Sequence, residues 1–147
     1  MDNFLSAEPL LIDRLTAELG TEAETVGSIT DMQEVEEQAQ RTPAVYVIFD
    51  GYRPGEAIPS GTAQKLIQQW LVVAAVRNVA AVHTGAEVRE DAGALIAKII
   101  PALQGHRLSP DHSLLRMASA PSAVHRDGFS YIPTAWETTV VTKPTGA

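Results

Sequence analysis

With 147 residues, the chain is long enough for one domain with a buried core, because chains of about 150 residues bury roughly 68–70% of their unfolded surface. It contains no cysteine, which excludes a disulfide framework and every thiolate metal site. Its formal charge is −7 and its eleven basic residues are scattered, which disfavours a DNA-gripping groove, since phosphate neutralisation needs clustered Lys and Arg.

The first predicted element is a helix over residues 6–19. Ser6 can cap its N-terminus, and Gly20 can end it. Its apolar residues recur every fourth position, at Leu11, Leu15 and Leu19. We expect this stripe to pack on a sheet.

A strand is predicted over residues 23–29, and a short helix is predicted after it. Thr30 and Gln33 form a capping-box pattern before that helix. Its apolar side should carry Met32, Val35 and Ala39, and its solvent side is strongly negative.

Two strands follow, predicted over residues 43–52 and within 64–79, and joined by loop 53–61. The second strand contains seven consecutive apolar residues from Trp70 to Val76, far fewer than the roughly 18–20 that span a bilayer. Because side chains alternate across a strand, both faces of these strands are apolar. We therefore expect these two strands to form an antiparallel pair in a sheet that is covered on both faces. Because the apolar run is too short to span a bilayer, we expect a soluble chain without a membrane partner.

The main covering helix is predicted over residues 84–103, with a capping box at its start and Pro101 near its end. Residues 105–127 are rich in loop signals, with one candidate strand at 113–119. A final strand is predicted over 129–141, with a bulge or a sheet edge near Pro133.

These elements predict an α+β fold over residues 1–147, with a mixed, mostly antiparallel sheet of about 4–5 strands and two main helices packed on it. If both helices cover one face, loops 105–127 or another subunit must cover the other. This pattern favours self-association, because leaving large apolar side chains wet forgoes roughly 1.5–3 kcal/mol each. The alternative is one helix on each face, which needs no partner.

No catalytic, cofactor-binding or metal-binding residue is predicted. The four histidines lack metal-ligand spacing, and no nucleophile elbow, phosphate loop or dinucleotide motif occurs. Asp50 beside Gly51 indicates a turn rather than an acid catalyst. Trp70 and Trp136 are interpreted as core or interface anchors, since a stacking platform for single-stranded nucleic acid needs basic neighbours.

Five segments in order resemble the tail terminator family of long-tailed bacteriophages, particularly the Mu-like type. They read FLSAEPLLIDRL, PAVYVIFDGYRP, QQWLVVAAVRN, DAGALIAKIIPAL and GFSYIPTAWETTVV, and together they span about residues 4–142. The resemblance implies a virion protein without enzymatic activity or cofactor. It would assemble in the bacterial cytoplasm as a homo-hexameric ring, which caps the tail tube and joins it to the head.

The partners implied are the major tail tube protein, the head–tail connector or neck proteins, and a sheath protein if the tail is contractile. Genomic DNA would pass through the ring without specific binding. Candidate subunit or tube contacts are Arg53, Glu56, Trp70, Arg107, Asp111 and Trp136. Candidate residues lining the DNA channel are Glu34, Glu36 and Glu37, whose carboxylates would repel phosphates over about 8–10 Å.

Two other functions stay open from the sequence. A neck or head-completion protein would also form a ring, but it would bind the portal side first. A small hydrolase or ligand-binding domain would be a monomer or dimer with a deep pocket, and only scattered polar residues favour it.

Overall fold

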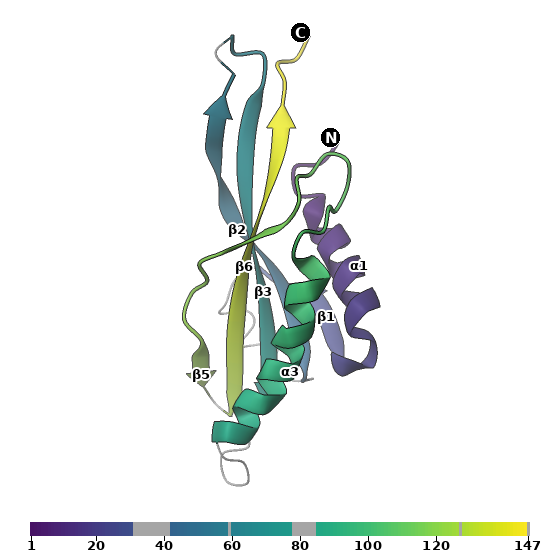
Figure 1. The fold of residues 1–147 in the computed structure, drawn as a ribbon, viewed down its shortest axis with the longest axis vertical. Helices are drawn as coiled ribbons and strands as arrows, with labels where there is room; N and C mark the ends of the chain where they lie inside the picture. The colour runs from purple at the N-terminus through teal and green to yellow at the C-terminus, as the bar shows by residue number, and fades with distance from the viewer. Residues whose placement is uncertain (31–41, 59, 78–84, 127, 147) are drawn as a thin grey trace.

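A computed structural model describes residues 1–30, 42–58, 60–77, 85–126 and 128–146, with the backbone alone for 85–91. The chain forms two long helices and a six-stranded mixed sheet, which confirms the predicted α+β class (Figure 1). The short helix predicted after Thr30 lies outside the described residues.

The first helix, α1, spans Ala7–Leu19 and buries the predicted stripe. It ends at Gly20, whose φ of 55° favours glycine and whose N–H donates to the Thr16 carbonyl. A 3-10 turn, η1 (Gly20–Glu22), continues from there. The predicted cap by Ser6 is wrong, because its side chain makes no capping bond. Instead, Asn3 Oδ1 accepts from the Leu5 N–H at 2.8 Å and orders the preceding turn.

The sheet has the strand order β1-β2-β3-β6-β4, and β5 also pairs with β6. β1 runs parallel to β2, and the other pairs are antiparallel. The strands are β1 (Thr25–Ser28), β2 (Ala44–Ala57), β3 (Gln64–Arg77), β4 (Arg116–Ala118), β5 (Val124–Arg126) and β6 (Phe129–Thr142). β5 was not predicted from the sequence, because three residues are too short to show an alternating pattern.

The strand β2 runs five residues beyond its predicted end and takes in part of the predicted loop 53–61. Register shifts between Phe49 and Tyr52 and between Pro54 and Ala57 accommodate the proline. Pro54 is tolerated because, among the described residues, no strand pairs with the outer edge of β2 there. Pro133 in β6 makes no bulge, and it lies between the segments that pair with β4 and β5.

Both helices pack on the same face of the sheet, which we call the helix face. α3 (Gly85–Leu103) ends two residues after Pro101, close to the predicted stop. Arg14 of α1 donates from Nε to the Ala102 carbonyl of α3 at 2.9 Å. The buried cluster on this face joins both helices to residues that include Val47, Trp70, Val72, Leu115 and Trp136.

The opposite face, which we call the loop face, is also buried in the body of the molecule. Its core includes Tyr46, Leu71, Val73 and Tyr131. Ala118 of β4, Val124 of β5 and Phe129 at the start of β6 pack against this core. The sequence left two possible covers for this face, the segment 105–127 or another subunit. The structure shows that the chain's own segment covers it. Burial of this part of the sheet does not require a second copy.

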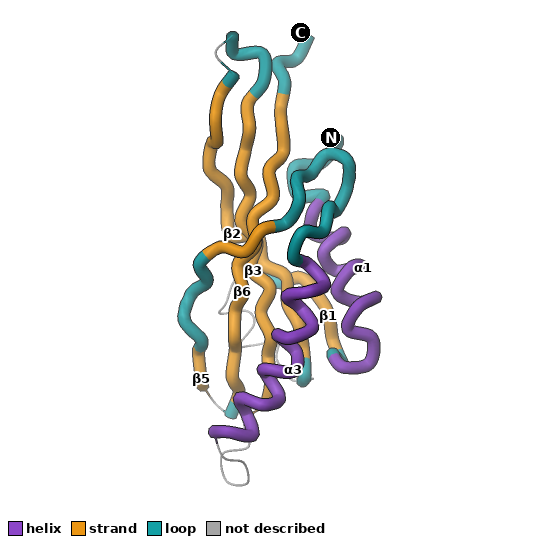
Figure 2. The backbone as a smooth tube through the Cα atoms, viewed as in Figure 1, coloured by secondary structure: helices purple, strands orange, loops and turns teal. Residues whose placement is uncertain are grey.

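The sheet is longer than the helix layer that covers it. β2, β3 and β6 have 14 residues each, which gives about 46 Å at 3.3 Å per residue. The 19 residues of α3 reach only about 28 Å at 1.5 Å per residue. Consequently the three strands continue past the helices as a ribbon, and the C-terminus lies near its far end (Figures 1 and 2).

Candidate interaction site

The ribbon, which we call the arm, consists of residues 52–58, 60–68 and 138–142. Its surface mixes exposed apolar and charged side chains, with Tyr52 58%, Ile58 45% and Val141 49% exposed. Arg53, Glu56 and Lys65 are also exposed there. Large exposed apolar residues gathered on one projection are typical of an interaction surface.

The N-terminal segment fixes the base of the arm on the helix face. The Phe4 ring contacts the Tyr52 and Phe49 rings edge-on, with centroid distances of 5.1 and 6.4 Å. Gln68 is fully buried, and its Nε2 donates to the Phe4 carbonyl at 2.6 Å. Its Oε1 accepts from Trp70 Nε1 at 3.2 Å. This network joins the chain start, the arm and the core.

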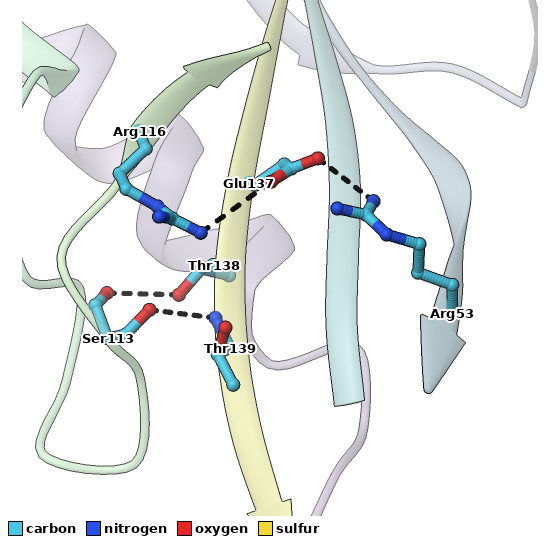
Figure 3. Close-up of polar contacts among 6 residues, drawn as sticks. All are labelled: Arg53, Ser113, Arg116, Glu137, Thr138 and Thr139. Carbon is cyan, nitrogen blue, oxygen red and sulfur yellow. Dashed lines mark hydrogen bonds and ion pairs between the residues drawn. The ribbon is translucent and has the colours of Figure 1, made fainter. Parts of the chain in front are cut away.

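An ion-pair cluster fixes the base of the arm on the loop face. Glu137 of β6 lies between Arg53 of β2, at 2.9 Å, and Arg116 of β4, at 3.8 Å (Figure 3). The Glu137 side chain is only 14% exposed, whereas both arginine side chains are more than half exposed. The cluster therefore connects the two outer strands of the arm and the short strand β4.

The loop between α3 and β4 is held against β6 by Ser113 (Figure 3). The Thr139 N–H donates to Ser113 Oγ at 2.8 Å, and the Ser113 N–H donates to the Thr139 carbonyl at 3.0 Å. Thr138 Oγ1 donates to the Ser113 carbonyl at 3.0 Å. Three hydrogen bonds thus give this loop a fixed position beside the arm.

A groove of about 560 Å³ lies between this loop and the arm. Three of its lining side chains are cationic, namely Lys65, Arg107 and Arg116, and one is anionic, Asp111. The remaining lining residues are Pro110, His112, Ser113, Leu114, Thr139 and Val141. The groove is therefore positively charged, although the whole chain is acidic.

His112 forms part of the groove wall and is only 2% exposed. Its Nδ1 lies 2.6 Å from Ser109 Oγ, while its buried Nε2 has no hydrogen-bond partner. Burial lowers the pKa of His112, and the negative charge of Asp111 opposes that shift. The imidazole is thus neutral near pH 7 and helps to shape the wall rather than supplying charge.

The structure sorts the residues predicted from the sequence into three groups. Arg53 and Glu56 lie on the arm, and Arg107 and Asp111 meet in the groove. Trp70 and Trp136 are 0% exposed and are register partners in the core, so neither offers a surface to a partner. The candidate channel residues Glu34, Glu36 and Glu37 lie outside the described residues.

Sequence analysis missed Lys65, Arg116 and Glu137. The alternation of β3 places Lys65 on the loop face of the arm, but no motif links it to Arg107, which is distant in the sequence. Glu137 interrupts an otherwise apolar and hydroxyl-bearing strand, a signal that could have indicated its pairing role.

Within the described ranges, no group of three or more His, Asp or Glu residues is placed to hold a metal ion. Among the same residues, no helix has both the length and the apolar character needed to cross a membrane.

No curated protein matched the chain. The model of one protein family, described as phage tail terminator protein, matches residues 1–145. The match covers nearly the entire sequence, including both helices, the sheet and the arm. It identifies a structural protein of the phage tail and hence a virion component: the chain belongs to the phage tail terminator protein family.

Proposed function

We propose that six copies of this chain close into a ring on the end of the tail tube, stop tube growth and present the surface that joins the head. The ring would lie in the tail–neck region, in contact with the tube protein below and neck proteins above. Family membership supports a role at the tail, and the arm supports a role in docking.

The single observation that carries this proposal is the arm with its open strand edges. β1 pairs with the outer edge of β2 only as far as Val47. On the outer edge of β6, the last backbone partner is Ser113, which bonds to Thr139. Beyond these points, the described part of the chain supplies no outer neighbour to either strand. Open edges are templates for pairing with another chain, and the exposed Ile58 and Val141 add apolar area.

A ring also explains why growth would stop. A head-to-tail contact closes into a ring when its rotation is suitable, and each subunit then presents one face upward and another downward. A downward face that matches the tube and an upward face that differs from it would end polymerisation. Docking is then a binding event and needs no catalytic group.

Two finer points from the sequence remain part of the proposal. Glu34, Glu36 and Glu37 would line the bore and limit adhesion of DNA, because like charges repel within roughly a Debye length of 8–10 Å. Assignment to the Mu-like type rests only on the order of the five sequence segments that resemble this family. If the tail is contractile, a sheath protein would be a neighbour.

The test is polymerisation of purified tube protein with and without the chain. We expect shorter tubes of uniform length, each with a ring at one end in negative-stain images. Ile58→Glu, at the tip of the arm, should weaken capping, because it places a charge on an exposed apolar contact. The matched control is Met117→Glu, at a similarly exposed apolar residue on β4.

Tubes of unchanged length that carry no ring would contradict the proposal. Binding to the portal or neck complex before any tube is present would favour the head-completion function instead.

A further inference from the structure

We propose that the cationic groove beside the arm binds the acidic N-terminal surface of a second copy, which we define as the exposed acidic residues of 1–30. This inference rests on the proposed ring and names the contact that closes it. The groove and the acidic surface are different parts of one chain, so the contact is head-to-tail and propagates from copy to copy.

Two of the three cations of the groove have no ion pair within the described part of one copy. These are Lys65 and Arg107, whereas Arg116 is ion-paired with Glu137 at 3.8 Å. The single acid of the groove, Asp111, lies 4.0 Å from the N-terminal amine. A concave site with a net positive lining and two cations that lack an ion pair is suited to carboxylates from outside.

The groove also has the mixed character of a protein contact. Leu114 and Val141, respectively 51% and 49% exposed, line it beside the charged groups. Its walls are fixed, because Ser113 bonds to Thr138 and Thr139, and His112 is buried against Ser109. The loop that forms the wall would therefore lose little backbone entropy when a partner binds.

The charge distribution of the chain identifies the occupant. Residues 1–30 contain six of the eighteen acidic residues and one of the eleven basic ones. Within 1–30, Glu18 pairs with Arg14 and Glu22 pairs with Lys98, whereas Asp13 and Glu24 are exposed without an ionic partner among the described residues. Each copy therefore carries a negative surface that complements its own positive groove, and such complementarity fixes register and steers association.

The experiment uses two pairs of charge reversals in the full-length chain. One variant carries Lys65→Glu and Arg107→Glu in the groove, and the other carries Asp13→Lys and Glu24→Lys on the N-terminal surface. In each variant alone, every contact between copies brings like charges together. Mass photometry over a concentration series, with and without tube ends, measures assembly.

We expect each variant alone to raise the concentration for half-maximal ring assembly at least about tenfold, since like charges at an interface are strongly unfavourable. An equimolar mixture should recover wild-type assembly, because the reversed groove of one variant then meets the reversed surface of the other. Lys143→Glu, an exposed charge outside the groove, is the matched control and should assemble normally. Circular dichroism with thermal unfolding verifies that each variant folds.

Failure of the mixture to assemble, or normal assembly of the groove variant alone, would overturn the inference. So would a wild-type chain that forms no ring at any concentration or on tube ends. A ring that shows the rescue but does not limit tube length would contradict only the proposed function. Groove variants that form rings yet lose tube or neck binding would assign the groove to another protein.

Discussion

Replacing Gln68 with Met should destabilise the fold through a single buried network. The side chain is fully buried, and both ends of its amide are used, one by the Phe4 carbonyl and the other by Trp70 Nε1. Met is similar in length but offers neither bond. A net hydrogen bond contributes about 1 kcal/mol, and a buried donor left without a partner costs about 1–3 kcal/mol, so we expect a loss of about 2–4 kcal/mol.

The assay is urea denaturation of the wild type, Gln68→Met, Trp70→Phe and the double variant, followed by circular dichroism. Trp70→Phe removes the indole N–H, so Gln68→Met should cost about 1–2 kcal/mol less in that background. Additivity of the two substitutions within about 0.5 kcal/mol would refute the reasoning, because it would mean that the indole gains nothing from Gln68.

Three further predictions concern the core, the groove wall and the channel. Ile99→Ala, in the buried face of α3, should cost about 2–5 kcal/mol in urea denaturation, whereas Met117→Ala should stay within about 0.5 kcal/mol; equal costs would contradict the packing. Because burial lowers the folded-state pKa of His112, wild-type stability should fall as pH drops below about 6.5 towards that lowered pKa. Thermal unfolding of His112→Gln should show a smaller fall, and an unchanged pH slope would count against a buried neutral imidazole. Reversing Glu34, Glu36 and Glu37 to Lys should slow DNA release from assembled virions, and unchanged release would remove them from the channel.

The periodic elements were predictable because their patterns follow directly from burial. The stripe of Leu11, Leu15 and Leu19 corresponds to the one buried side of a helix. The two-sided apolar strand around Trp70 corresponds to a strand that is buried on both faces. The end of β2 was not predictable, because Pro54 normally opposes a strand and is tolerated only where the outer edge is open. The segment that covers the loop face was also not predictable, because residues from Ala118 to Phe129 show no helical or strand periodicity.

The candidate site was only partly predictable. Arg53, Arg107 and Asp111 were chosen because they lie among loop signals. The structure places Arg53 on the arm, and it places Arg107 and Asp111 in the groove beside the arm. Lys65 and Arg116 joined them only through strand pairing and the crossing of the loop over β6, which no local pattern encodes. Trp70 and Trp136 show the opposite outcome, because large aromatic residues fit a core as readily as an interface.

The most direct test of the central claim is a cryo-electron microscopy map of tail tubes assembled in the presence of this chain. The account predicts six copies in a closed ring at one tube end, with the open edges and exposed residues of each arm in contact with the tube or with a neighbouring copy. Copies bound singly, copies located away from the tube end, or arms left free in solvent would contradict it.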